Sequence, residues 1–174
     1  LVGFFVGLAS GASVVIAQYY GARDRERLSA SVHTAVILAL VSGLFFMILG
    51  IGTARTILRI MQTPQDIMDD AMAYIRVYYM GMIPLMLYDM GTSILRALGD
   101  SRRPLYFLIA SAIANILLDL LFVAVIPMGV AGAALATVLS ELLACVLTLM
   151  CLVKADGEPW QLRLKNLRVS PMQL

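Results

Sequence analysis

The sequence predicts an all-α fold, a polytopic membrane helix bundle with five transmembrane helices. Hydrophobic residues make up 61% of its 174 residues and charged residues only 14%, against about 25% charged residues in a typical soluble domain. The mean hydropathy is +0.89. A soluble domain of this size cannot hide so much apolar surface, and a net charge of +2 is too small to hold a polyanion. These observations exclude a soluble enzyme, a disordered chain and a nucleic-acid partner.

Five apolar runs reach the length of about 20 residues that a transmembrane helix needs. The predicted spans are about 1–20, 32–54, 74–98, 104–126 and 130–153, which together form a bundle over 1–153, followed by a connector or tail at 154–174. The runs are too long to be alternating strands. Because Leu1 already lies in an apolar run, we expect the chain to be part of a longer protein.

The basic residues predict the orientation of the chain in the membrane. Segments 21–27 and 96–104 and the tail beyond 153 carry 10 of the 13 Lys and Arg residues, and they alternate with the other connections along the chain. Basic connections of membrane proteins face the cytoplasm. We therefore expect a multi-pass protein of the cytoplasmic (inner) membrane with a cytoplasmic C-terminal tail.

Glycine positions predict helix ends and helix contacts. Gly21 and Gly99 stand where two helices are expected to stop, because glycine tolerates a positive φ. Their loops, GARD and GDSR, resemble each other and suggest repeated helix pairs. The spacing of Gly3, Gly7 and Gly11 forms a stripe of small residues, which predicts close contact with another helix.

The third span carries a predicted hinge and several methionines. Pro84 follows Gly81 by three residues within this span. Proline removes a helical hydrogen bond, so we expect the helix to bend at this pair. Bent, glycine-containing helices are common in transporters. The methionines are interpreted as core packing, with a pocket wall as the alternative.

Three carboxylates, Asp89, Asp119 and Glu141, lie at membrane depth. A charge at the bilayer centre costs roughly 2.5–3.5 kcal/mol on insertion scales, so each needs an explanation. Asn115 and Asp119 are four residues apart and share one helix face. An amide beside a carboxylate can serve both its charged and its protonated form, so this pair can hold a proton or a small cation.

A short turn at 127–129 makes the fourth and fifth spans antiparallel neighbours. It places Thr137 at a depth similar to that of Asp119, and Thr137 shares a face with Glu141. We therefore predict a polar cluster of Asn115, Asp119 and Thr137 that couples transport to a cation or proton, with Glu141 as a further member. Glu141 and Asp89 are additional protonatable candidates.

Each polar residue also has a structural interpretation. Asp119 can reach the outer surface, and Glu141 can have a structural partner. Asp89 can pair with Arg96, which follows it by two helical turns. His33 lies near the predicted cytoplasmic end of its span, where an interfacial role is the simplest interpretation.

Four segments together resemble one family of membrane proteins. They are GASVVIAQYYGARD (11–24), RALGDSRRPLYF (96–107), NILLD (115–119) and GVAGAALATVLS (129–140). In this order they are similar to multidrug and toxic compound extrusion (MATE) transporters. The combination of NILLD and GAALAT resembles the N-terminal half of these transporters, with the five spans as helices two to six of a six-helix lobe.

The resemblance implies a twelve-helix transporter of two lobes that exports organic, often cationic compounds in exchange for H⁺ or Na⁺. It implies no other cofactor and no fixed metal site, and Asp119 is the candidate ligand if Na⁺ is the coupling ion. Asp119, Asn115 and Thr137 match the family's N-lobe cation site. The implied partners are membrane lipid, a small organic substrate, and the rest of the transporter, namely its first helix and C-terminal lobe.

Three alternatives remain open from the sequence. A lipid-linked saccharide flippase belongs to the same superfamily, but it needs a more basic cavity. An intramembrane serine protease would use Ser10 and His33, yet Ser10 lies mid-span and His33 near the end of the next span. A purely structural subunit would leave Asp119 facing lipid.

Overall fold

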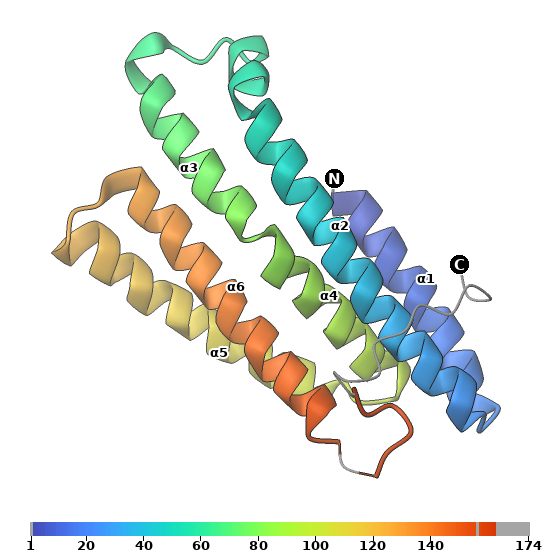
Figure 1. The fold of residues 1–174 in the computed structure, drawn as a ribbon. Coiled ribbons are helices and arrows are strands. Elements are labelled where there is room, and N and C mark those ends of the chain that lie inside the picture. Colours follow the sequence, from blue (N-terminus) through green and yellow to red (C-terminus); the bar gives the residue numbers. More distant parts are fainter. Residues whose placement is uncertain (1, 156, 163–174) are drawn as a thin grey trace.

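The computed structural model describes residues 2–155 and 157–162, which form a bundle of helices with no strand among them (Figure 1). The elements are α1 (Val2–Gly21), α2 (Arg25–Ile60), the 3₁₀ turn η1 (Gln65–Ile67), α3 (Met68–Met80), α4 (Met82–Ala97), α5 (Arg102–Asp119), the π-helical segment η2 (Leu120–Val125) and α6 (Gly129–Val153). Within the described chain, three helices are long and apolar enough to cross a membrane, namely α2, α5 with η2, and α6. The predicted all-α membrane bundle is confirmed. The tail beyond residue 162 lies outside the described residues.

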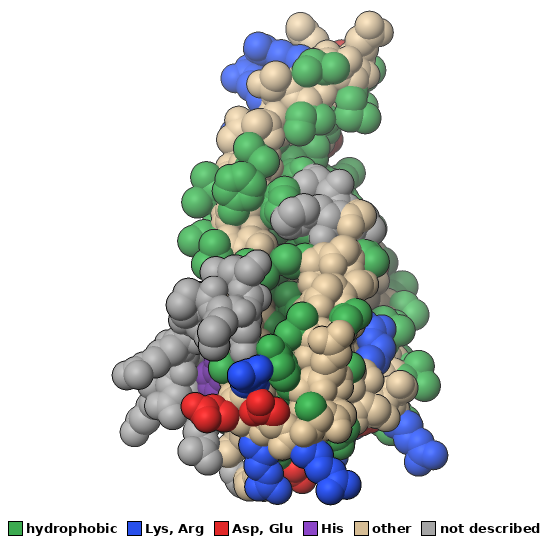
Figure 2. Space-filling view, turned by 90° about the vertical axis from the view of Figure 1, so that its right-hand side faces the viewer, with side chains coloured by type: hydrophobic (Ala, Val, Ile, Leu, Met, Phe, Trp, Pro, Cys, Tyr) green, Lys and Arg blue, Asp and Glu red, His purple; other side chains and the backbone are tan. Residues whose placement is uncertain are grey.

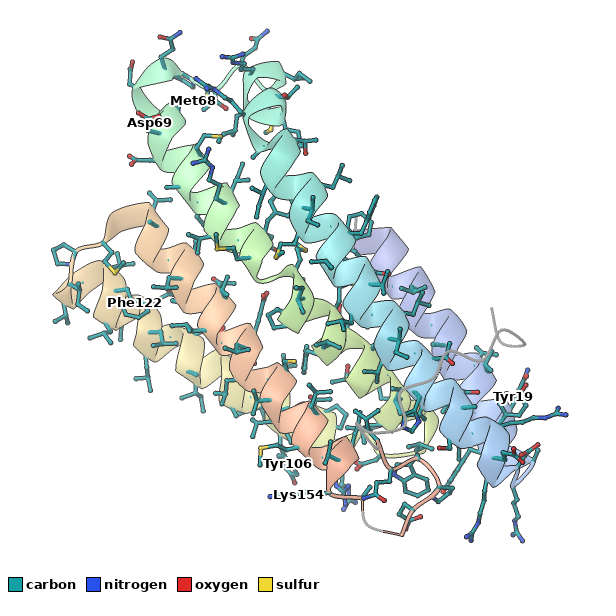
Figure 3. The ribbon with its side chains drawn as sticks, in the orientation of Figure 1. Tyr19, Met68, Asp69, Tyr106, Phe122 and Lys154 are labelled. Carbon is teal, nitrogen blue, oxygen red and sulfur yellow. The ribbon has the colours of Figure 1, made fainter. Side chains whose placement is uncertain are left out.

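The rod formed by α3 and α4 lies in the middle of the bundle, between α1 with α2 and α5 with α6 (Figure 1). α2 packs against both α3 and α4, and α1 packs against α2 and α4. On the other side, α6 packs against α3, α4 and α5, whereas the main neighbour of α5 is α6. Figure 3 shows Tyr19, Tyr106 and Lys154 at one end of the bundle and Met68 and Asp69 at the other. The segments predicted to be cytoplasmic therefore share one end.

Three methionines on one face of α4 fill its contact with α1 and α2. Met82, Met86 and Met90 follow one another at four-residue spacing, so they share one face of α4. All three are buried within the core that α1, α2 and α4 build. Unbranched thioether side chains fill irregular gaps between helices well. The packing interpretation therefore holds for these three residues.

The outward faces of α5 and of the second half of α2 are apolar and uncovered. Soluble monomers rarely expose apolar patches of this extent, so these faces suit lipid or another part of the membrane protein. The exposed side chains include Val41, Phe45 and Ile48 on α2 and Leu105, Leu108, Ile109, Ile113, Ile116 and Leu117 on α5.

The helix α4 ends at a glycine, as the sequence predicts. Gly99 has φ +87°, a left-handed conformation that L side chains rarely adopt. The N–H of Gly99 donates to Arg96 O at 3.0 Å, and the N–H of Asp100 donates to Leu95 O at 2.9 Å. This pair of bonds is the Schellman motif, which satisfies carbonyls that the last turn leaves unpaired.

The helix α1 ends in the same way, and its last residue is Gly21, where the sequence predicts the helix to stop. The left-handed residue is Arg23, with φ 56°. The positive φ expected at Gly21 is thus found two residues later, and the closing bonds run from Arg23 N to Tyr20 O and from Asp24 N to Tyr19 O, both at 3.1 Å. An arginine thus occupies a position where glycine is favoured.

An aspartate follows the left-handed residue in both loops and accepts a backbone hydrogen bond from the first turn of the next helix. Asp24 Oδ1 accepts from Arg27 N at 3.1 Å, and the two side chains form an ion pair at 3.5 Å. Asp100 Oδ1 accepts from Arg103 N at 3.1 Å, and these side chains pair at 3.1 Å. The loops therefore share one construction, with Arg23–Asp24 matching Gly99–Asp100.

The third predicted span is two helices with a break at Gly81. α3 ends at Met80 and α4 begins at Met82, and Gly81 N donates to Tyr78 O in a tighter turn at 3.0 Å. Pro84 is the third residue of α4. The missing N–H of proline removes no helical bond there, because the first N–H groups of a helix have no intrahelical partner. The interruption thus lies at the glycine, and Pro84 is accommodated in the first turn after it.

Backbone contact between α2 and this break depends on Gly43. A Cβ at Gly43 would lie 2.9 Å from Ile83 Cα and 3.2 Å from Met82 O. Among the described residues, none lies within 4 Å of a Cβ at Gly7 or Gly11, so no described helix makes the close contact predicted for this stripe. Those two glycines instead line an open groove between α1 and α2.

We expect Gly43→Ala to lower the stability of the intact membrane protein by about 1–3 kcal/mol, because the added methyl meets backbone that cannot move aside. Gly52→Ala is the matched control in the same helix, since a Cβ there meets nothing within 4 Å. This control should match or exceed wild type, because alanine favours a helix by up to about 1 kcal/mol over glycine. Thermal unfolding of the purified protein measures both effects, and equal midpoints for the two variants would contradict the contact.

Candidate functional site

Asp119 lies at a change of helix type. It is the last residue of α5, and the π-helical segment η2 follows directly. The wider turn of η2 is closed by Ile126 N, which donates to Leu121 O at 2.9 Å. Such segments are rare and occur frequently at functional sites. The run LLFVAV at 120–125 contains neither glycine nor proline, so the sequence carries no signal that predicts it.

Two buried polar atoms of α5 have no partner in the described part of the chain. Asn115 Nδ2 and Asp119 Oδ1 each expose less than 1 Å² and form no hydrogen bond there. They lie one turn apart on the same helix face but do not bond to each other. Buried polar groups are nearly always paired. The amide of Asn115 and the carboxylate of Asp119 could therefore bind a polar species between them. The carboxylate could also bind a cation by itself.

The start of α6 is held close to η2. A Cβ at Gly132 would lie 3.0 Å from Phe122 O and 2.9 Å from Met128 Cβ. Figure 3 shows Phe122 at this end of the α5–α6 pair. Because α6 is also the main neighbour of α5, we infer that the buried atoms of Asn115 and Asp119 lie on the side of α5 that faces α6.

Thr137 lies one turn beyond this contact on α6. Its Oγ1 donates to Ala133 O at 3.0 Å, which leaves the oxygen lone pairs able to accept or to ligate. Among the residues that the structure describes, Thr137 does not hydrogen bond to Asn115 or Asp119. The predicted cluster of these three residues therefore stays a prediction.

Glu141 contacts the helix break. Its Oε2 lies 3.1 Å from the position that a Cβ at Gly81 would take. It forms no hydrogen bond or ion pair with any described residue, while Asp89 and Tyr78 lie within electrostatic reach. The structure thus brings Glu141 of α6 together with Asp89 of α4 and the end of α3, a grouping that sequence spacing does not reveal.

Asp89 and Arg96 do not form the ion pair that their spacing allows. Arg96 Nη2 donates instead to Thr92 Oγ1 at 3.3 Å and to Ser93 Oγ at 3.4 Å. The backbone oxygen of Asp89 accepts from Thr92 Oγ1 at 3.0 Å. The Asp89 carboxylate therefore has no ion pair within the described chain.

Ser10 and His33 do not form a nucleophile and base. Ser10 is exposed, and its backbone oxygen accepts from Ser13 Oγ at 2.9 Å. His33 is buried, and its Nδ1 donates to Ser29 O at 2.7 Å. The described residues also contain no group of three or more His, Cys, Asp or Glu side chains that could hold a metal ion.

Comparison with known proteins identifies the family. The MatE family model matches residues 1–121 of the chain. The chain belongs to the MatE family. It is 36% identical over 165 residues to the probable multidrug resistance protein YoeA of Bacillus subtilis (strain 168), covering 92% of this chain and 35% of that protein. It is 30% identical over 159 residues to the probable multidrug resistance protein YpnP of the same organism, covering 91% of this chain and 36% of that protein. The chain thus spans little more than a third of the length of these relatives.

Solved MATE structures share the fold. A MATE transporter in a bent conformation superimposes with a TM-score of 0.90 at 28% identity, over 97% of this chain and 38% of that chain. An inward-facing structure of a multidrug resistance MATE transporter has a TM-score of 0.89 at 28% identity, over 97% of this chain and 38% of that chain. An outward-facing structure also has a TM-score of 0.89, at 27% identity, over 99% of this chain and 38% of that chain. MatE-family proteins are transporters coupled to ion gradients and are not enzymes, so the serine protease hypothesis is rejected.

We expect Asp89→Asn and Glu141→Gln each to raise the stability of the purified protein, because each removes one of two carboxylates that repel each other away from water. The double variant should gain less stability than the sum of the two single gains, and the difference, which is the coupling free energy, should be about 0.5 kcal/mol or more. Thermal unfolding of the four proteins gives this coupling. Asp69→Asn is the control, since Asp69 is exposed at the far end of α3. Strictly additive effects would show that Asp89 and Glu141 act independently.

Proposed function

We propose that this chain forms part of the N-terminal half of a secondary multidrug efflux antiporter. The complete transporter exports organic, often cationic compounds in exchange for H⁺ or Na⁺. The observation that carries the proposal is the buried, unpartnered oxygen of Asp119 beside the buried amide of Asn115. MatE membership and the two Bacillus subtilis relatives named as multidrug resistance proteins support the export of drugs.

The side chains around Asp119 suit either coupling ion. Na⁺ is a hard cation and prefers oxygen ligands. The carboxylate of Asp119, the amide oxygen of Asn115 after a half-turn of the amide, and the hydroxyl of Thr137 are all oxygen donors. A proton needs only the Asp119 carboxylate. In both cases a positive charge neutralises a group that is costly at membrane depth.

Coupling requires that the ion binds the inward-facing and outward-facing states with different affinities, since a ligand with equal affinity shifts no equilibrium. The equal TM-scores to inward-facing and outward-facing relatives are compatible with a bundle that keeps its shape in both states. We therefore propose that the bundle moves as one body against the rest of the transporter. Ion binding at Asp119 then changes the contacts that this body makes there.

The distribution of charge favours a cationic substrate over a lipid-linked saccharide. From Pro104 to Val153 the only charged residues are Asp119 and Glu141. The fold alone does not decide between these functions. A MOP-superfamily transporter from Pyrococcus furiosus has a TM-score of 0.86 at 27% identity, over 99% of this chain and 38% of that chain, and its binding pocket of reversed polarity suggests a different function. Acidic side chains within the spans support the exchange of positive charges.

The location and orientation follow from the same proposal. We place the protein in the cytoplasmic membrane with the α1–α2 and α4–α5 loops and the C-terminal tail in the cytoplasm. The end shared by Tyr19, Tyr106 and Lys154 supports this arrangement (Figure 3). The remaining helices of the transporter would complete the substrate cavity, and membrane lipid would cover the exposed apolar faces of α2 and α5.

We expect Asp119→Asn in the intact transporter to reduce ion-driven export of a fluorescent organic cation by roughly 10-fold or more, because a charge-assisted interaction of about 1.5–3 kcal/mol is lost. Vesicles with an imposed pH gradient, a Na⁺ gradient or neither report which ion drives export in the wild type. Asp69→Asn, at the far end of α3, should export normally. Full gradient-driven export by Asp119→Asn at equal protein level would remove Asp119 from the coupling mechanism.

A further inference from the structure

A cavity of about 650 Å³ opens where α1 ends and α2 begins. One wall comes from Tyr20, Arg23, Arg25 and Leu28, and the other comes from the segment after α6, including Trp160. We propose that this cavity binds the phosphate of an anionic membrane phospholipid. The inference is independent of the proposed efflux function, because it involves none of the residues around Asp119.

The two arginines of the cavity carry charge that the described chain does not neutralise. Arg23 and Arg25 are exposed side chains that form no ion pair or hydrogen bond with any described residue. The acidic residue between them, Asp24, is already paired with Arg27 at 3.5 Å. Guanidinium groups match phosphate oxygens with two parallel hydrogen bonds, so this pair suits a phosphate group.

The turn that carries Arg23 does not itself require an arginine. Arg23 has φ 56°, a left-handed conformation that glycine adopts without strain, as Gly99 does at φ +87° in the next loop. Gln62 adopts the same conformation after α2, at φ 58°, so this turn also accepts other side chains. The arginine at this position presents its guanidinium to the cavity.

The opposite wall is fixed before any ligand binds. The ring of Trp160 contacts the ring of Tyr20 edge to face, at 5.6 Å between centroids. Leu162 is buried, and its N–H donates to Leu152 O at 3.0 Å. Gln161 Nε2 donates to Val153 O at 3.1 Å. The segment thus satisfies carbonyls at the end of α6, and a preformed wall lowers the cost of ordering on binding.

The surroundings favour a lipid phosphate over a free one. Tyrosine and tryptophan rings are enriched at the headgroup level of membranes, and basic pockets between helix ends bind anionic headgroups there. Leu28 lines the cavity, and α1 exposes apolar side chains such as Val14 toward the membrane interior. Figure 2 shows Lys and Arg side chains at this end of the bundle, with Asp and Glu side chains beside them. An acyl chain can therefore follow the apolar face while the phosphate meets the arginines.

The test compares lipids in titrations of the delipidated intact protein, followed by native mass spectrometry. The ligands are short-chain phosphatidylglycerol, phosphatidylcholine of equal chain length, and inorganic phosphate. Arg23→Gly with Arg25→Gln removes both guanidinium groups, and the glycine preserves the turn as Gly99 does in the next loop. Arg102→Gln is the control, because Arg102 is an exposed arginine of that other loop.

Wild type and Arg102→Gln should bind phosphatidylglycerol more tightly than phosphatidylcholine. Each arginine removed should weaken phosphatidylglycerol binding about 5-fold, and the double variant about 25-fold. Glu158 also lines the cavity, so Glu158→Gln should tighten binding. Equal phosphatidylglycerol affinity in wild type and the double variant would overturn the proposal. It would equally be overturned if inorganic phosphate bound as tightly as phosphatidylglycerol with the same dependence on the arginines, since the site would then take free phosphate.

Discussion

The cost of a carboxylate at membrane depth constrains the rest of this structure. A charged group in the hydrocarbon region needs a partner, a proton or access to water. The described chain supplies no ion pair to Asp119, Asp89 or Glu141. The helices around these residues therefore have to create polar space inside an apolar bundle. Two departures from regular α-helix lie beside these residues, namely η2 directly after Asp119 and the break at Gly81 beside Glu141.

These two irregularities lie on opposite sides of α6. α6 contacts the α3–α4 rod on one side and α5 on the other, so it separates the Asp119 group from the Asp89–Glu141 group. Glu141 belongs to the second group, and Thr137 lies one turn before it on α6. A shift of α6 along its axis would alter the surroundings of both groups at once. This arrangement provides a physical route by which charge at one group influences the other, and it requires no contact between Asp119 and Glu141.

The sequence predicts the parts of the fold that composition and spacing determine. Long uncharged runs predict the membrane bundle, and the glycine before Asp100 predicts the end of α4, because only glycine adopts the left-handed conformation without strain. α1 also ends at Gly21 as predicted, but the left-handed residue that follows is Arg23, and no propensity predicts an arginine there. The π-helical segment after Asp119 and the approach of Glu141 to Gly81 arise from packing between helices. Sequence spacing along one helix carries no information about such contacts.

The repeated loop construction separates what the fold requires from what a particular side chain does. Both loops close a helix with the same pair of backbone bonds, and both carry an aspartate that pairs with an arginine three residues on, in the first turn of the next helix. The fold therefore requires a left-handed residue followed by Asp. Glycine meets that requirement in the α4–α5 loop at no strain, so the arginine of the α1–α2 loop is not explained by the turn. Its chemistry has to be explained by what lies beside it, which is the cavity against Trp160 at the level where the helices leave the membrane.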